Sequence, residues 1–166
     1  MSAFNKNPKI ECDFRDAVVN LESGTPSQIL GVTVCVRNKN KNVKLDWSVC
    51  EFLSSLDLDG PSEVLEVSPN AAVEYTLCRN GVMIGSTVTS SHRIDSLLNI
   101  PGVSDATQTL SFEHESQPNF TFCDENPVCG VNNYELKALL LQPGDGATSV
   151  ATLLDRSLAA VCFDKK

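Results

Sequence analysis

Hydrophobic and polar residues alternate with a period of two along much of this chain. The alternating segments are 30–36, 43–50, 73–78, 120–122 and 134–140. Alternation of this kind indicates strands that bury one face and expose the other. The pattern therefore predicts an all-β protein.

Short turn signals separate the alternating segments. Asn80-Gly81 lies between two of them, and because both residues tolerate positive φ, it predicts a two-residue type I′ hairpin. Further turn signals are Ser23–Pro26, Asn38–Asn42, Asp59–Pro61, Ser68–Asn70, Pro101–Gly102 and Pro143–Gly146. Only Ser91–Asn99 has helical spacing, which predicts one short helix. Short strands joined by turns are typical of a two-sheet antiparallel sandwich, and we expect the jelly-roll type.

The first nine residues of the chain lack this alternation. Met1–Lys9 is polar, so we expect residues 1–16 to form an N-terminal extended arm, a candidate connector, before a β-sandwich domain over residues 17–166. An arm of this kind is disordered unless something binds it. In an assembling protein it can add to the edge of a neighbour's sheet. A frayed terminus is the alternative.

Composition and charge fit one folded domain and narrow the partners. Of the 166 residues, 42% are hydrophobic, and 13 Lys+Arg against 21 Asp+Glu give a net charge of -8. Nucleic-acid-binding proteins carry a basic stripe instead, so we expect no nucleic-acid partner. The sequence has neither the apolar core of a secretory signal nor a run long enough to span a membrane. We therefore expect either a cytoplasmic chain or one released to the outside without the general secretory route.

The cysteines are the main candidates for chemistry. There are seven, an odd number, so at least one sulfur has no partner inside the chain. The alternation places four of them on strand faces opposite the large apolar side chains: Cys35, Cys50, Cys78 and Cys123. Free structural cysteines are usually buried, so these positions favour cross-linking, with inert thiols as the alternative. The candidates for intermolecular cross-links are Cys12, Cys35, Cys50 and Cys123. The other disulfide candidates are Cys78, Cys129 and Cys162, and the sequence leaves the connectivity open.

Metal binding and catalysis have little support in the sequence. Zinc sites repeat closely spaced ligand pairs, whereas Cys123 and Cys129 have five residues between them and no second pair follows. His92 and His114 would join such a site only through the fold. Acidic pairs that lack the full calcium-loop pattern are Asp13 with Asp16 and Asp57 with Asp59. No nucleophile motif is present, so we expect no enzyme, metal or cofactor.

A non-catalytic binding module is the alternative to an assembling protein. It would be a carbohydrate- or receptor-binding jelly roll on a surface protein. Sugar-binding surfaces need exposed aromatic rings. Trp47, Tyr75 and Tyr134 point inward according to the alternation, which disfavours this reading.

Several segments resemble small cysteine-containing β-proteins of endospore-forming bacteria. In a clostridial spore-associated family, the second and third strands are similar to Ile29–Val34 and Val43–Ser48, and the central hairpin is similar to Val73–Gly81. The segment Phe120–Leu136 resembles the penultimate strands of that family, which also carry cysteine. The ending, Ala151–Val161, is similar to the last strand of exosporium and spore-fibre jelly rolls. The likeness spans most of residues 25–163.

The resemblance implies a function in assembly. In endospore appendage subunits a jelly roll polymerises, and an N-terminal connector forms disulfides with neighbouring subunits. By position, Cys12 would be the connector thiol, and Cys35, Cys50 or Cys123 would accept it. This chain departs from those subunits because its arm has one cysteine where they have a close pair. The expected partner is the chain itself, together with other spore-surface proteins.

Overall fold

The computed structural model describes residues 9–58, 65–67, 70–92, 95–97, 109–141 and 147–165. The strands are β1 (Ile10–Arg15), β2 (Val19–Leu21), β3 (Ser27–Val36), β4 (Lys41–Leu58), β5 (Leu65–Val67), β6 (Asn70–Arg79), β7 (Val82–His92), β8 (Asp95–Leu97), β9 (Thr109–Ser116), β10 (Asn119–Asp124), β11 (Gly130–Leu141) and β12 (Ala147–Asp164).

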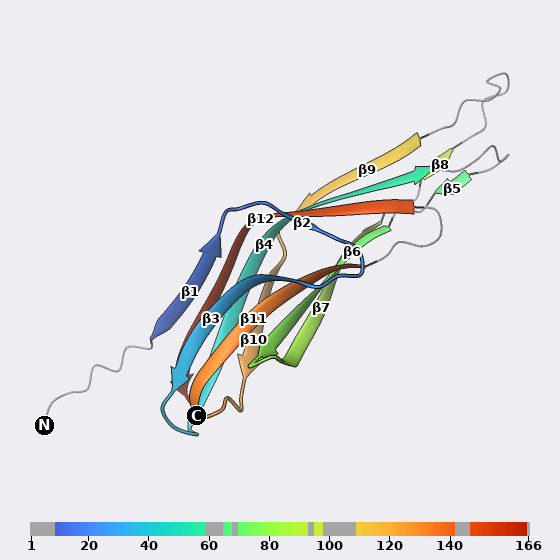
Figure 1. The fold of residues 1–166 in the computed structure, drawn as a ribbon. Helices are drawn as coiled ribbons and strands as arrows, with labels where there is room; N and C mark the ends of the chain where they lie inside the picture. The colour runs from blue at the N-terminus through green and yellow to red at the C-terminus, as the bar shows by residue number, and fades with distance from the viewer. Residues whose placement is uncertain are drawn as a thin grey trace, which may run out of the picture.

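Two antiparallel sheets form the body of the protein, which confirms the predicted two-sheet sandwich (Figure 1). The first sheet, sheet A, has the order β1-β12-β4-β10, with β2 also on β12 and β9 also on β4. The second, sheet B, has the order β3-β11-β6-β7. Strands β5 and β8 pair separately. The jelly-roll type of the sandwich stays a prediction.

The core lies between the sheets and follows the alternation of the sequence. Inward side chains of β3, β4, β6, β11 and β12 form one continuous cluster that includes Val34, Leu45, Leu77, Leu136 and Leu158. Since successive side chains of a strand point to opposite faces, every second residue enters this core. Trp47, Tyr75 and Tyr134 are buried there, as the alternation predicts.

The two sheets approach each other along both sides of the sandwich. On one side, the backbone N–H of Gly31 in β3 donates to Oδ2 of Asp13 in β1 at 3.0 Å. On the other, β7 lies against β10, because a Cβ added at Gly85 would come within 2.9 Å of the Phe122 ring. β1 and β3 are therefore edge strands on one side of the sandwich, and β7 and β10 are edge strands on the other.

The local predictions have mixed outcomes. Asn80 and Gly81 have φ values of 51° and 79° and connect β6 to β7, which confirms the hairpin. The predicted helix over Ser91–Asn99 is wrong: β7 extends to His92, and Asp95–Leu97 is the strand β8. Pairing with neighbouring strands overrides the local spacing here. The turn signals Asp59–Pro61, Pro101–Gly102 and Pro143–Gly146 lie outside the described residues.

The predicted arm contains one strand of the sandwich. Residues 10–15 are β1, which pairs antiparallel with β12 along its whole length. The remaining part of the arm before it, residues 1–8, lies outside the described residues. Figure 1 shows β1 at the outer border of sheet A, beside β12. The candidate connector is thus attached to the edge of its own sheet.

Candidate functional site: thiols at the sheet edges

All seven cysteines are free, and their exposure follows the position of their strand within the sheet. Cys12 on β1, Cys35 on β3 and Cys123 on β10 are exposed, and each of these is an edge strand. Cys129, in the loop between β10 and β11, is also exposed. An edge strand has a neighbour on one side only, so a short side chain on it stays accessible. These four thiols can reach another molecule.

Cysteines on inner strands are covered to a greater degree. Cys50 on β4 and Cys162 on β12 are half-buried, and Cys162 packs against the hydrophobic core. Cys78 on β6 shares a face with Glu135, opposite the core, as the alternation predicts, but its side chain is buried. It lies opposite Glu135 of β11 and Met83 of β7, at a register shift of β6 against β7. Residues directly opposite share a face, so longer side chains flank the short thiol on both sides.

The surroundings of three thiols disfavour their reactive form. Burial, followed by the charges of Glu115 and Asp155, raises the pKa of Cys50. Burial and nearby acidic groups also raise the pKa of Cys123 and of Cys162, although Lys41 acts in the opposite direction on Cys162. A thiolate is the nucleophile in disulfide exchange, so the raised pKa lowers the reactive fraction of these three thiols near neutral pH without blocking exchange.

Five of the seven cysteines lie at one end of the sandwich, which we call the cysteine end. It consists of residues 35–43, 78–83, 123–131 and 161–164, where β3, β6, β10 and β12 end. The C-terminus lies at this end in Figure 1. Cys35 and Val131 are directly opposite each other there, and both are exposed. Further exposed apolar side chains of the cysteine end are Val82, Met83 and Val128.

A buried polar network holds the loop that carries Cys129. Asp124 is 6% exposed, and its carboxylate accepts from Nη1 of Arg79 at 2.7 Å and from the hydroxyl of Tyr134 at 2.8 Å. Within the loop, Nδ2 of Asn132 donates to the carbonyl of Val128 at 2.7 Å. The side chains of β6 and β11 thus fix the path of the chain around Cys129. This thiol is presented on an ordered loop.

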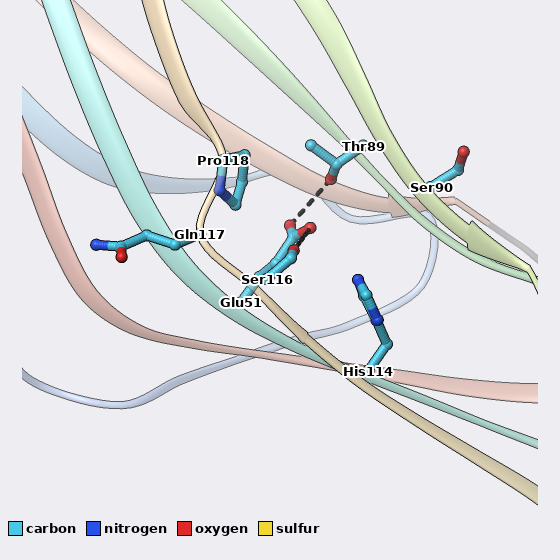
Figure 2. A pocket seen from close by; sticks show the side chains of 7 residues that line it. All are labelled: Glu51, Thr89, Ser90, His114, Ser116, Gln117 and Pro118. Atoms are coloured by element: carbon cyan, nitrogen blue, oxygen red, sulfur yellow. Dashed lines mark hydrogen bonds between the residues drawn. The ribbon is translucent and has the colours of Figure 1, made fainter.

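A second polar cluster lies away from the cysteine end, in an open cleft of about 370 Å³. Figure 2 shows its lining, with Glu51 at its centre. Glu51 is 1% exposed, and its carboxylate accepts from the hydroxyls of Tyr75 at 2.7 Å, Thr89 at 2.9 Å and Ser116 at 2.7 Å. The other residues that line the cleft are Ser90, His114, Gln117 and Pro118.

The geometry of the Glu51 cluster is that of a structural connection between the sheets. Glu51 is on β4 of sheet A, whereas Tyr75 and Thr89 belong to β6 and β7 of sheet B. Burial, reinforced by Glu51, raises the pKa of Tyr75 far above its usual range, so the phenol stays protonated and donates. The carboxylate accepts from hydroxyls of both sheets and links them.

The remaining sequence candidates do not come together as a site. Within the described residues, no group of three or more His, Cys, Asp or Glu side chains is arranged to hold a metal ion. His114 lines the cleft, and Asp13 binds Gly31 and Arg15. His92 ends β7, Asp57 is in β4, Asp16 follows β1, and Asp59 lies outside the described residues. No helix in the described part of the chain is long and apolar enough to cross a membrane.

Comparison with known proteins does not identify a family. No model of a protein family matches the chain, and no curated protein matches it. Among solved structures, one that matches is the crystal structure of dimeric latent PorU from Porphyromonas gingivalis, at 13% identity. The match covers 95% of this chain but 13% of that chain, with a TM-score of 0.31. A similarity this low supports no argument about fold or function.

Sequence reasoning found the thiols but not their grouping. The alternation correctly separated the exposed Cys35 and Cys123 from the core residues. It gave no signal for the Glu51 cluster, whose four residues come from four different strands. A glutamate at an inward position of β4, between Val49 and Leu53, was the one available hint.

Proposed function

We propose that this protein is a structural subunit that self-assembles into an extracellular fibre or spore-surface appendage. Copies join by edge-strand addition and are covalently fixed by intermolecular disulfides. The partner is the chain itself, with other spore-surface proteins as further partners. The role needs no catalysis, cofactor, nucleic acid or membrane span.

The observation that supports this proposal is the position of the accessible thiols. Cys12, Cys35 and Cys123 are on edge strands, which are the strands that can pair with another chain. Cys129 is exposed on the ordered loop of the cysteine end. A disulfide at any of these positions joins the same surfaces that strand addition brings together.

Charge and compartment agree with covalent assembly outside the cell. Two copies that each carry a net charge of -8 repel one another, so disulfides that add to strand pairing help to hold the copies together. Disulfides offset that repulsion, and they persist in oxidising surroundings such as the spore surface. In a cytoplasmic location, which is the alternative, the thiols would stay reduced.

A gel comparison of cysteine variants tests the proposal. The purified chain is concentrated in air and run on a denaturing gel without reductant. We expect a ladder of multimers that collapses when reductant is added. Combined replacement of Cys12, Cys35, Cys123 and Cys129 by serine removes the ladder, because it removes the exposed thiols.

The matched control replaces cysteines of the inner strands. Cys50→Ser and Cys162→Ser change half-buried thiols on β4 and β12 and leave the ladder intact. A chain that stays at the position of a single subunit after oxidation at high concentration would contradict the proposal. A ladder that depends on the inner cysteines would contradict the assignment of the linking thiols.

The binding module of a surface protein is less well supported as a second function. Trp47, Tyr75 and Tyr134 are buried, and the Glu51 cleft is lined without an exposed aromatic ring. Phe14 and Phe163 are exposed aromatic side chains. They lie on β1 and at the end of β12, where they are better placed for contact with another copy.

A further inference from the structure

In strand β1 the charged side chains face inward and the apolar side chains face outward, which is the reverse of the other strands of its sheet. Glu11, Asp13 and Arg15 are directly opposite the inward residues Ala160, Leu158 and Arg156 of β12. Residues directly opposite in an antiparallel pair share a face, so the three charged side chains of β1 face the inner side of the sheet.

The apolar side chains of β1 face outward. Ile10 is 58% exposed, Phe14 is 65% exposed, and Cys12 between them is exposed as well. No residue of β1 belongs to the hydrophobic core or to the partly buried side chains packed against it. Removing β1 from its sheet therefore takes no side chain out of the hydrophobic core.

Polar contacts hold β1 in place. They include the backbone ladder to β12 and the hydrogen bond from the Gly31 N–H to Asp13. Arg15 lies directly opposite Arg156, and like charges in that position are destabilising. Asp13, paired with Arg15 at 2.9 Å, offsets part of this repulsion. Identical contacts form when the strand comes from a second copy.

β1 covers two sheet edges at once. It pairs with the outer side of β12, and through Asp13 it occupies a backbone donor of β3. When β1 leaves, both edges become open to another strand. A strand of the same sequence fits both edges, because it brings the Asp13 carboxylate to Gly31 in the register that the structure shows. A second copy of this chain supplies that strand.

We infer that β1 exchanges between copies: the β1 of one subunit pairs with β12 of the next, where that subunit's own β1 was bound. The inference rests on the proposed self-assembly and names the strand and the edge that it uses. Residues 16–18 between β1 and β2 are the hinge, and Leu21 of β2, which is buried, keeps the rest of the chain in place. Such exchange is a low-cost route to assembly.

The exchange is directional, which determines the product. Each subunit gives β1 to one neighbour and receives β1 from another, so the donor and acceptor surfaces differ. A contact of this kind that does not close into a ring produces a filament. Cys12 travels with the exchanged strand and comes to lie on the outer face of the neighbour's sheet A, opposite Ala159.

Isotope mixing of an Ala159→Cys variant tests the exchange. Cys12 and Ala159 are paired across β1 and β12, so the variant can form a disulfide wherever the two strands meet. Unlabelled and ¹⁵N-labelled chains are mixed as reduced monomers, concentrated until light scattering shows assembly, oxidised and digested. We expect about half of the peptides joined through residues 12 and 159 to contain one labelled and one unlabelled chain, as random pairing between copies requires.

A second pair within one sheet is the matched control. Asp46→Cys with Thr121→Cys links β4 to β10, which are directly paired and do not include β1. Its joined peptides contain a single isotope under every condition. Single-isotope peptides from residues 12 and 159 in assembled material would overturn the exchange and leave the proposed assembly standing. Absence of assembly by light scattering would overturn both.

Discussion

Two buried carboxylates, Glu51 and Asp124, determine much of the polar chemistry inside this sandwich. Each accepts a hydrogen bond from a tyrosine of the opposite sheet: Tyr75 for Glu51 and Tyr134 for Asp124. A buried acceptor that loses its donor bears a full desolvation penalty, so such pairs are costly to break. They fix the spacing of the sheets as well as stabilising them.

Tyr75→Phe tests the connection made by Glu51. The substitution keeps the ring in the core and removes the hydroxyl that donates at 2.7 Å. We expect the free energy of unfolding to fall by about 1.5–3 kcal/mol, the usual range for a hydrogen bond to a charged group. Urea unfolding of the reduced chain measures it.

The control for this prediction is Thr121→Val. Thr121 also donates to a carboxylate, that of Asp46 at 2.6 Å, but on the exposed face of the sheet. We expect a change within about 0.5 kcal/mol for this surface position. If both substitutions lowered the free energy of unfolding by the same amount, the buried hydrogen bond from Tyr75 to Glu51 would contribute no more than the exposed one from Thr121 to Asp46.

Thiol reactivity gives a second prediction, at Cys123. Burial and the charges of Glu125 and Asp124 raise its pKa above the usual value of 9.0. The thiolate fraction is therefore low at pH 7, and it grows as the pH rises past 9. Alkylation of Cys123 by iodoacetamide, followed by peptide mass spectrometry, should be slower at pH 7 than at pH 9, and at pH 7 it should be faster for Glu125→Gln than for the natural chain. Equal rates for the two chains would contradict the charge effect.

Single residues show where the sequence was informative and where it was not. The alternation identified Trp47 and Tyr134 as inward because a strand has only two faces. It could not predict that Cys78 is buried, since the burial depends on two neighbours across the sheet. Glu135 comes from β11, which is far away in the sequence, and Met83 comes from β7, whose register against β6 shifts at this point. Coverage by neighbours is a property of the assembled sheet.

At the scale of the element, β1 differs from the other strands because its inward-facing side chains are charged. Inward-pointing charges on an edge strand are a known way to weaken unwanted pairing. Here they also separate the strand from the core, so that its attachment depends on β12 and on Asp13. The sequence shows Ile10, Cys12 and Phe14 in alternation with charges but does not reveal which set faces inward.

The attachment of β1 should weaken in acid. Burial raises the pKa of Asp13, but the hydrogen bond from Gly31 and the interactions with Arg15 and Arg156 outweigh it and leave the pKa below its usual 3.8. A carboxylate whose pKa is lower in the folded state than in the unfolded state stabilises the fold at every pH above its unfolded-state pKa. This stabilisation is lost as the pH falls through the folded-state pKa.

Asp13→Asn measures this contribution. At pH 7 we expect the variant to be less stable than the natural chain by about 1 kcal/mol, the value of a typical hydrogen bond. The difference should shrink as the pH falls below 3.8, where the carboxylate of the natural chain is protonated. Urea midpoints measured from pH 7 to pH 2.5 provide the test. A difference that stays constant with pH would contradict the role of the charge.

Truncation provides a further prediction for this element. Deletion of Met1–Glu11 removes the first two residues of β1 and nothing from the core. We expect a folded monomer with the circular dichroism of the full chain, because the sandwich does not depend on β1. Light scattering after concentration in the presence of reductant should detect no assembly, because the shortened β1 loses part of its backbone ladder to β12 while the remaining thiols stay reduced. A truncated chain that assembles as well as the full chain would show that assembly does not need the N-terminal region.

At the scale of the whole molecule, the sequence predicted the architecture but not its functional arrangement. Period-two alternation and the Asn80-Gly81 turn were sufficient for a two-sheet sandwich, because both depend on local backbone geometry. The pairing of β12 with both β1 and β4 joins residues far apart in the chain and has no local signal. For the same reason, the grouping of five cysteines at one end emerged only from the fold.

The arrangement of the thiols gives the molecule its proposed role. Exposed cysteines lie on the edges and at the cysteine end, while the inner strands cover theirs. A folded subunit of this kind can be covalently joined to others without unfolding.

Electron microscopy of the oxidised full-length chain at high concentration tests this role most directly. We predict filaments whose subunits separate only when reductant and denaturant are both present, since strand pairing and disulfides each hold them. Single, separate particles under these conditions, together with one band on a gel without reductant, would contradict the central claim that the protein assembles with itself.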